Sequence, residues 1–390
     1  MSIINANELL EGLSLALDVA ENKTFEHAQR TAFIALKIAK ELKLSEEELQ
    51  DIFVASLLHD IGMTTSIADS HQDVSLVVAH CQVGAQMIAS LPFPKKVSEY
   101  IRWHHANWDG SGPFECEGAS IPVGSQIIFL ADQLDVVFQE FGSIYNDRSE
   151  IRNKLNKRSG VHFNPQLVAA FFAVQSNEIF WLEYSSPYLS EILRAIRPTI
   201  NLEIDSKYFE QIAKIFAKII DNKSPFTYEH SQGVTSVAIR LGEHFKLDKE
   251  TLQKLKISAL LHDLGKLTIP NSILDKPGKL TLIEYQRIKS HPYYTKLILS
   301  RIKGLETIRD WAGNHHETLD GKGYPEGIRE ERLCLPERII AVSDIYQALT
   351  EERPYRKPLP ESQVMNIIQG MVKEHKLSSE VFANLSIVLK

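Results

Sequence analysis

Histidines and aspartates recur in the same register in both halves of the chain. Each half contains two histidines 32 residues apart, an aspartate directly after the second, a third histidine, a histidine pair 24 residues further on, and a closing aspartate. In the second half these residues are His230, His262, Asp263, His291, His315, His316 and Asp344. In the first half they are His27, His59, Asp60, His80, His104, His105 and Asp132. Ten of the 14 histidines occupy matched positions, so we interpret the chain as a tandem duplication.

These side chains are ligands that divalent transition metals prefer. The three cysteines lie far apart and form no CxxC pair, so nitrogen and oxygen would hold a metal rather than sulfur. Seven ligands exceed the four of a tetrahedral zinc site and suit two ions about 3.5–4 Å apart that share a bridge. Asp263 has two carboxylate oxygens and can bridge both ions while His262 holds one of them. The donor set predicts two divalent ions, iron or manganese, with zinc as the alternative.

Cationic side chains close in sequence to the seven candidate ligands of the second half indicate an anionic substrate. Lys266 lies one helical turn after the second histidine, so its ammonium group would reach a substrate oxygen or protonate a leaving group. Arg353 and Arg356 follow the closing aspartate and offer bidentate phosphate recognition, although such residues are often only solvated. We predict hydrolysis of a phosphate ester by a hydroxide that bridges two metals, with Asp263 and Lys266 as catalytic residues.

Helices must position these residues. Apolar residues recur every three to four positions across 235–245, and the stretch 254–261 continues similarly toward the second histidine. No long alternating segment indicates a strand, and glycine-rich turns such as 320–323 interrupt the periodic stretches. We therefore predict an all-α fold with two tandem helical bundle domains. The predicted parts are a first domain at 1–182, a linker at 183–203 and a catalytic domain at 204–390.

Composition restricts the partners of the protein. The chain has 390 residues, of which 44% are hydrophobic and 24% charged, as in ordinary globular proteins. Its net charge of −7 argues against duplex nucleic acid as a partner but leaves room for a small anion. No apolar run approaches the ~20 residues that span a bilayer. The first residues lack the basic start and apolar core of a signal peptide, so we expect a cytoplasmic protein with no membrane partner.

The second half resembles an HD-GYP domain, the branch of the HD phosphohydrolase superfamily that hydrolyses cyclic dinucleotides. The resemblance covers residues 226–356 and rests on LLHDLGK, which ends at Lys266, on the DGKGYP turn at 320–325, and on SDIYQALTEERPYR, which ends at Arg356. It implies degradation of cyclic di-GMP to pGpG, to GMP or to both. Phe226 occupies the position where some members carry a glutamate for a third ion, so the resemblance implies two metals.

The resemblance also implies a role for each matched residue. One metal would be held by His230, His262, Asp263 and Asp344. Asp263 would bridge to a second metal, which would be held by His291, His315 and His316. The substrate phosphates would be bound by Lys266, Arg353 and Arg356.

The first half resembles a degenerate copy of the same domain. It keeps all seven ligand types, which makes a second metal site possible at His27, His59, Asp60, His80, His104, His105 and Asp132. Met63 stands where the second half has Lys266, Gly112-Pro113-Phe114 replaces Gly-Tyr-Pro, and the arginine cluster has no counterpart. We expect this half to hydrolyse nothing. It would instead pair with the second domain within one chain or sense a nucleotide.

Two alternatives to cyclic di-GMP hydrolysis stay open. The first is the same reaction on 3′,3′-cyclic GMP-AMP, because nothing in the residues separates guanine from adenine. The second is a catalytically silent receptor that binds a cyclic dinucleotide and signals through a protein partner, whose identity the sequence does not give. Retention of every ligand, of Lys266 and of both arginines argues against the silent receptor.

Overall fold

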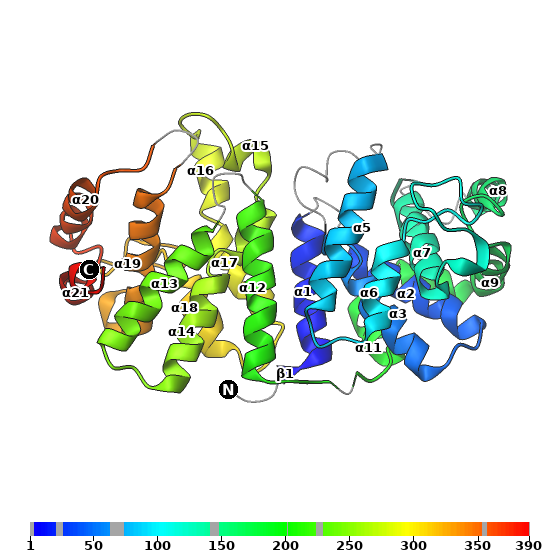
Figure 1. The fold of residues 1–390 in the computed structure, drawn as a ribbon, viewed down its shortest axis with the longest axis horizontal. Coiled ribbons are helices and arrows are strands. Elements are labelled where there is room, and N and C mark those ends of the chain that lie inside the picture. The colour runs from blue at the N-terminus through cyan, green and yellow to red at the C-terminus, as the bar shows by residue number, and fades with distance from the viewer. Residues whose placement is uncertain are drawn as a thin grey trace. The chain divides into compact units, whose positions relative to one another are not determined.

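The described part of the chain is all-α, as the sequence predicts (Figure 1). The computed structural model describes residues 4–20, 26–62, 74–140, 148–200, 202–223, 229–352 and 357–389. The described strands are β1 (Ile4–Asn5) and β2 (Glu203–Ile204), which pair antiparallel with Ile4 opposite Ile204. Across the described ranges, no helix has the length and apolar character needed to cross a membrane.

The chain divides into two compact units. The N-terminal unit comprises residues 13–202, and the C-terminal unit comprises residues 1–12 and 203–390, so the division falls within α1 (Ala6–Ala20). The division into a first domain at 1–182, a linker at 183–203 and a catalytic domain at 204–390 stays a prediction. Packing shows which residues fold together, but it does not show which part of the chain carries an activity.

Helices make up both units. In the N-terminal unit they are α2 (His27–Glu41), α3 (Glu46–Leu58), α5 (Val74–Ala89), α6 (Lys95–Trp103), η1 (Gly118–Ser120), α7 (Val123–Glu140), α8 (Arg148–Arg158), α9 (Pro165–Gln175), α10 (Glu178–Tyr184) and α11 (Leu189–Ile196). In the C-terminal unit they are α12 (Ser206–Asn222), α13 (His230–His244), α14 (Lys249–Leu261), η2 (Leu264–Thr268), α15 (Asn271–Leu274), α16 (Leu282–Ile288), α17 (His291–Leu299), α18 (Glu306–Gly313), η3 (Glu330–Arg332), α19 (Leu335–Thr350), α20 (Glu361–Lys373) and α21 (Ser379–Val388).

The repeat extends to the backbone around the first histidine of each unit. Glu26 and Glu229 directly precede α2 and α13, and both adopt the left-handed conformation, with φ of 71° and 73°. An upstream aspartate then accepts the second amide of each helix, since Asp18 binds the Ala28 N–H at 2.8 Å and Asp221 binds the Ser231 N–H at 3.0 Å. Each unit thus starts this helix with the same turn, which places the first histidine at its first position.

Capping residues fix the helix that ends at the His-Asp pair. Ser45 and Glu48 form a capping box at the start of α3, and Asp248 accepts two amide N–H groups at the start of α14. Both helices then run 13 residues, and the second histidine of each unit is the C-cap residue. The aspartate of each pair therefore lies just beyond the helix, where it is not restricted to one helical face.

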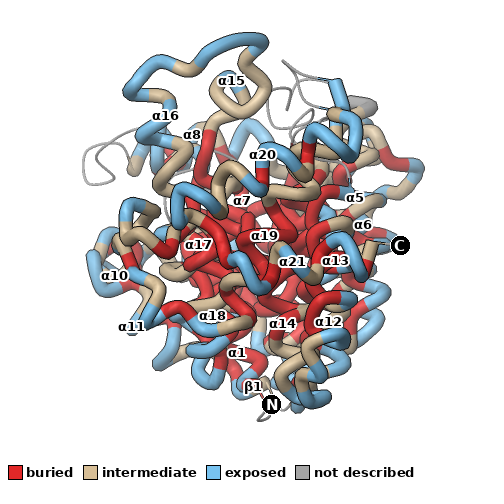
Figure 2. The backbone as a smooth tube through the Cα atoms, turned by 90° about the vertical axis from the view of Figure 1, so that its left-hand side faces the viewer, coloured by how far each residue is buried: buried red, intermediate tan, exposed pale blue. Residues whose placement is uncertain are grey.

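An apolar core holds the helices of the C-terminal unit in place. Val234, Leu241, Leu255, Ile340 and Val342 are fully buried and belong to one cluster contributed by α13, α14 and α19. Figure 2 shows this buried interior in red, whereas α16 is mostly exposed. The metal-ligand candidates of this unit are attached to the ends and inner faces of these packed helices.

The glycine two residues after each His-Asp pair allows close contact between chain segments. A Cβ at Gly265 would lie 1.9 Å from the carbonyl oxygen of His291, and a Cβ at Gly62 would lie 2.1 Å from that of His80. Only a residue without a side chain fits at either position. The third histidine of each unit is thereby held close to its His-Asp pair.

We expect Gly265→Ala to lower the free energy of unfolding by about 1–3 kcal/mol, because backbone must shift to admit the methyl group. Urea denaturation measures the effect. Gly370→Ala in α20 is the matched control, since its Cβ would meet nothing within 4 Å. That variant should be unchanged or more stable by up to about 1 kcal/mol. Equal losses in both variants would contradict the role assigned to Gly265.

Candidate metal centre

All seven predicted ligands of the C-terminal unit converge on one buried site. His230 and His291 are the first residues of α13 and α17, and His262 is the C-cap of α14. The remaining four come from the turns after α14 and α18 and from α19: Asp263, His315, His316 and Asp344. Six of the seven are buried, and His316 retains 22% side-chain exposure. Ligands from five separate helices therefore meet at one point.

The Asp263 carboxylate lies between two groups of imidazoles. Its Oδ2 is 3.3 Å from His262 Nε2 and 3.7 Å from His230 Nε2. Its Oδ1 is 3.3 Å from His291 Nε2 and 3.9 Å from His315 Nε2. One carboxylate oxygen thus faces each group, as a carboxylate that bridges two ions requires.

Asp344 faces the same two groups from the opposite helix. Its Oδ1 lies 3.2 Å from His230 Nε2, and its Oδ2 lies 3.8 Å from His316 Nδ1. Ligand atoms about 2.0–2.2 Å from a shared ion lie about 3–3.6 Å from each other in octahedral or tetrahedral geometry. Most separations between donor atoms in this site fall in or near that range, so the residues fit metal ions without rearrangement.

The hydrogen bonds of His291 and His315 give further support for a cation. Their Nε2 atoms are 3.1 Å apart, while their Nδ1–H groups donate to the carbonyl oxygens of Ile288 at 2.8 Å and Ala312 at 2.6 Å. Burial lowers the pKa of His315 well below its usual value, so this imidazole is neutral. The Nε2 of His315 then carries no proton, so its lone pair is directed toward His291 Nε2 and is available to a cation.

Two further buried atoms lack hydrogen bonds. His262 Nε2 and Asp263 Oδ1 have no hydrogen-bond partner among the described residues, although both point into the site. Burial disfavours ionisation of Asp263, but His262, Lys266 and the other imidazoles outweigh it and hold the pKa of this carboxyl well below its usual value. Burial also lowers the pKa of His316 to about 3. Burial disfavours the charged form of His230, but hydrogen bonds to Asp344 and Glu351 outweigh it and raise the pKa of this imidazole to about 9. The site therefore presents an ionised Asp263 with neutral His315 and His316, and a metal bound at His230 would displace its Nε2 proton.

Lys266 is in contact with this site, but it lies on η2 and not one turn further along the helix of His262, because α14 ends at Leu261. Its Nζ donates to Asp263 Oδ2 at 2.6 Å, and its side chain is 19% exposed. The ammonium group can therefore reach both the carboxylate and a solvent-accessible substrate. Arg353 and Arg356, predicted to bind phosphate, lie outside the described residues, as do Phe226 and Met63.

The Gly-Tyr-Pro turn supports His316. The Tyr324 N–H donates to the His316 carbonyl oxygen at 3.1 Å, and the two rings lie 4.9 Å apart. Lys289 also contacts this tyrosine, with its Nζ 4.9 Å from the centre of the Tyr324 ring. The turn thus covers one of the least buried ligands of the site.

Glu317 organises this turn, a role that the sequence alone does not reveal. It is buried, and its carboxylate accepts three backbone N–H groups, from Glu326 at 2.7 Å, Gly327 at 3.1 Å and Ile328 at 2.9 Å. The first half has Ala106 in the same register. That replacement of an acid by alanine, next to the histidine pair, is the signal that could have identified Glu317.

The seven predicted residues of the N-terminal unit also converge. His27 Nε2 lies 3.2 Å from Asp132 Oδ1, and His59 Nε2 lies 3.0 Å from Asp60 Oδ2. His80 Nε2 lies 3.3 Å from Asp60 Oδ1. Two groups of possible ligands result, namely His27 with His59 and Asp132, and His80 with Cys81, His104 and His105.

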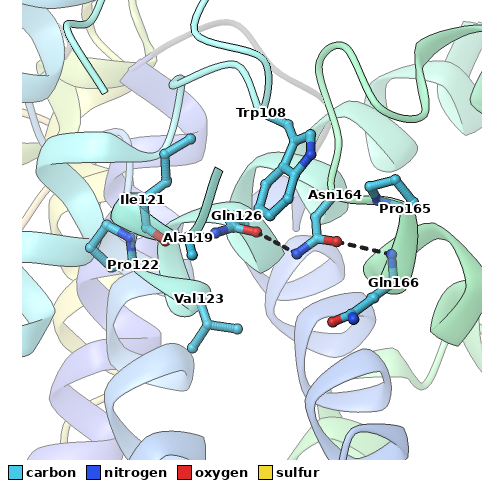
Figure 3. A pocket seen from close by; sticks show the side chains of 9 residues that line it. All are labelled: Trp108, Ala119, Ile121, Pro122, Val123, Gln126, Asn164, Pro165 and Gln166. Carbon is cyan, nitrogen blue, oxygen red and sulfur yellow. Dashed lines mark hydrogen bonds between the residues drawn. The ribbon is translucent and has the colours of Figure 1, made fainter. Parts of the chain in front are cut away.

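A cavity of about 640 Å³ in the N-terminal unit does not include these ligands (Figure 3). It is lined by Trp108, Ala119, Ile121, Pro122, Val123, Gln126, Asn164, Pro165 and Gln166. The side-chain N–H of Asn164 donates to Gln126 Oε1, and Asn164 Oδ1 accepts the backbone N–H of Gln166. No charged side chain lines the cavity, so it offers nothing to balance a phosphate.

Comparison with known proteins identifies the class. A model of the HD domain family matches residues 13–167 and 214–381. The chain belongs to this family, and the predicted tandem architecture and the resemblance to HD-GYP proteins are confirmed.

Three relatives define the similarity more closely. The chain is 31% identical to 3′3′-cGAMP-specific phosphodiesterase 1 of Vibrio cholerae, over 97% of this chain and 90% of the relative. It is 38% identical to the cyclic di-GMP phosphodiesterase PA4108 of Pseudomonas aeruginosa, over 34% of this chain and 32% of the relative. The crystal structure of a V. cholerae cyclic GMP-AMP-specific phosphodiesterase, V-cGAP3, superposes with a TM-score of 0.73 at 29% identity, covering 100% of this chain and 98% of that one.

Glu317→Gln should lower the free energy of unfolding by about 1–3 kcal/mol, because one oxygen acceptor is lost while three buried N–H groups remain. Urea denaturation measures this loss, and hydrogen exchange should accelerate at residues 326–328. Glu326→Gln is the control, because its carboxylate pairs with Lys296 and is 53% exposed. It should change stability by less than about 1 kcal/mol. Unchanged exchange at 326–328 in Glu317→Gln would contradict the role of Glu317.

Proposed function

We propose that the protein is a metal-dependent phosphodiesterase that hydrolyses a cyclic dinucleotide at the C-terminal unit. The observation that carries the proposal is the Asp263 carboxylate, which lies between two imidazole groups and contacts Lys266. Cyclic di-GMP, hydrolysed to pGpG, GMP or both, is the first candidate substrate. The second candidate is 3′,3′-cyclic GMP-AMP, for which relatives matched over 97% and 93% of this chain are named.

The residues that would hold the metals fall into two groups joined by Asp263. We assign His230, His262 and Asp344 to one ion and His291, His315 and His316 to the other, with one Asp263 oxygen on each. Iron or manganese suits this mixture of imidazole and carboxylate better than zinc. Two such ions, when bound, would neutralise phosphodiester charge and lower the pKa of water.

The chain itself contributes orientation and a proton. The Nδ1–H bonds from His262, His291 and His315 to backbone carbonyls hold each ring with Nε2 toward the centre. We assign two roles to Lys266, which can leave Asp263 to bind a phosphate oxygen and can then protonate the departing sugar oxygen. Arg353 and Arg356 would bind the second phosphate, a role that rests on the HD-GYP resemblance alone.

A receptor without hydrolytic activity is the competing hypothesis. It would use the same ligands to bind a cyclic dinucleotide and would release no product. The contact between Lys266 and Asp263 favours the enzyme, because a receptor has no need of a proton donor beside a bridging carboxylate.

Product analysis by chromatography tests the proposal. Full-length protein, purified without oxygen and loaded with iron or manganese, is incubated separately with the two candidate dinucleotides. Linear dinucleotide or mononucleotide should appear, and Asp263→Asn should reduce the rate far more than the matched Asp60→Asn. The relative rates on the two substrates rank them. Stoichiometric binding of dinucleotide with no product would overturn the enzyme in favour of the receptor.

Lys266→Met introduces the residue that the first half carries in this register. We expect kcat to fall by about 10²–10⁴-fold, the range of general acid catalysis, while the metal content stays constant. Lys289→Met, which removes a cation from the Tyr324 ring rather than from Asp263, is the comparison and should have the smaller effect on kcat. A loss of metal together with activity in Lys266→Met would contradict a role in proton transfer.

A further inference from the structure

We propose that the cavity of about 640 Å³ lined by residues of η1, α7 and α9 binds an uncharged, flat heterocycle with an N–H donor at its edge, which is the chemistry of a purine base. The proposal rests on a comparison of this cavity with the matched place in the C-terminal unit, where side chains fill the space. It involves none of the candidate metal ligands and does not depend on the proposed hydrolysis.

The backbone around the cavity is repeated in the C-terminal unit. The Trp108 carbonyl oxygen accepts the Gly118 N–H at 2.8 Å. The Leu319 carbonyl oxygen likewise accepts the Glu330 N–H at 3.1 Å. These hydrogen bonds put Trp108 and Leu319 in the same register, so the two places can be compared side chain by side chain.

Gln126 and Arg338 form a second matched pair, with equivalent contacts and different chemistry. Gln126 Nε2 donates to the Ile121 carbonyl oxygen at 2.6 Å. Arg338 Nε donates to the Leu333 carbonyl oxygen, in the same register, at 2.9 Å, and Arg338 also pairs with Glu330. Gln126 is shorter and uncharged, so the N-terminal unit lacks both the bulk and the charge of this arginine.

The two matched places differ in the space that they leave. The place around Arg338 has a cavity of only about 10 Å³, which is lined in part by the charged side chains of Glu317, Glu337, Arg338 and Lys376. The N-terminal cavity has about 640 Å³, and none of its lining residues is charged. Small-molecule sites commonly have about 300–1,000 Å³. The N-terminal cavity therefore has the size of a ligand site, and a negative charge on the ligand would gain nothing there.

A flat ligand matches the walls of the cavity. Figure 3 shows the Trp108 ring directed toward the hydrogen bond between Asn164 and Gln126. An indole stacks on aromatic rings, which the matched Leu319 cannot do. Three lining residues are exposed, so a ligand can enter from solvent: Ala119, Pro165 and Gln166.

Gln126 supplies an acceptor for the edge of this ligand. Because the Ile121 carbonyl oxygen holds Nε2, Gln126 Oε1 faces Asn164, which donates one hydrogen bond to it at 3.0 Å. An amide oxygen accepts two hydrogen bonds, so one lone pair remains for an N–H group of the ligand. The arginine of the matched place has donors alone and could not accept this bond.

Isothermal titration calorimetry on the full-length protein tests the proposal with adenine, an uncharged flat base with an amino group at its edge. We expect adenine to bind, and we expect Gln126→Arg to remove this binding. Only the binding that Gln126→Arg removes is assigned to the cavity, because the candidate metal centre could also hold a nucleotide. For this fraction, adenosine 5′-monophosphate should bind no more tightly than adenine, since no lining residue is a cation.

The variants use residues that the matched backbone already carries, and far-UV circular dichroism verifies their folding. Gln126→Arg should weaken adenine binding about tenfold or more, because it fills the space and removes the acceptor. Trp108→Leu should weaken it about 2- to 10-fold through the loss of stacking. Gln86→Arg adds the same charge at an exposed position of α5 and should leave binding unchanged.

Three outcomes would overturn the proposal. The first is no heat of binding up to the solubility limit of adenine. The second is adenine binding that both Gln126→Arg and Trp108→Leu leave unchanged. The third is a nucleotide that binds the cavity more tightly than adenine, because it would show that the site takes a charged ligand.

Discussion

The orientation of three imidazole rings is the constraint on which the C-terminal site depends. The Nδ1–H groups of His262, His291 and His315 each donate to a backbone carbonyl oxygen of the preceding turn. Their Nε2 atoms then converge around Asp263, whose Oδ2 also accepts a hydrogen bond from Lys266. Helix packing has to hold these rings in place whenever no cation is present. The fully buried core of α13, α14 and α19 provides that support.

Duplication has preserved the ligand positions and altered what surrounds them. The left-handed residue before the first histidine, the capped helix before the His-Asp pair and the glycine after it occur in both units. The contacts behind the ligands differ, since Asp135 and Arg30 take the places of Gln347 and Gly233. Glu317 likewise corresponds to Ala106. The two units therefore share the same seven residue types and differ in the contacts behind them.

Residue identity and spacing predicted the fold class and the gathering of the ligands. The repeated intervals of histidine and aspartate collected seven candidate ligands, and the resemblance to HD-GYP domains then assigned His230 and Asp344 to the same ion across more than a hundred residues. Which ring nitrogen carries the proton could not be predicted, because it depends on whether a carbonyl oxygen of the preceding turn is available. His80 and His291 have the same register but lie inside a helix and at a helix start, respectively.

The pairing of β1 with β2 has a consequence for how the protein is made. Ile4 lies opposite Ile204, and Glu8 accepts the amide N–H of Lys303, so residues that precede the N-terminal unit belong to the unit that follows it. During synthesis they must wait for the second repeat while the intervening unit folds. The C-terminal unit is therefore not a contiguous stretch of sequence. A boundary drawn between the two repeats would separate this strand from its partner, in a gene fusion as well as in an evolutionary exchange of domains.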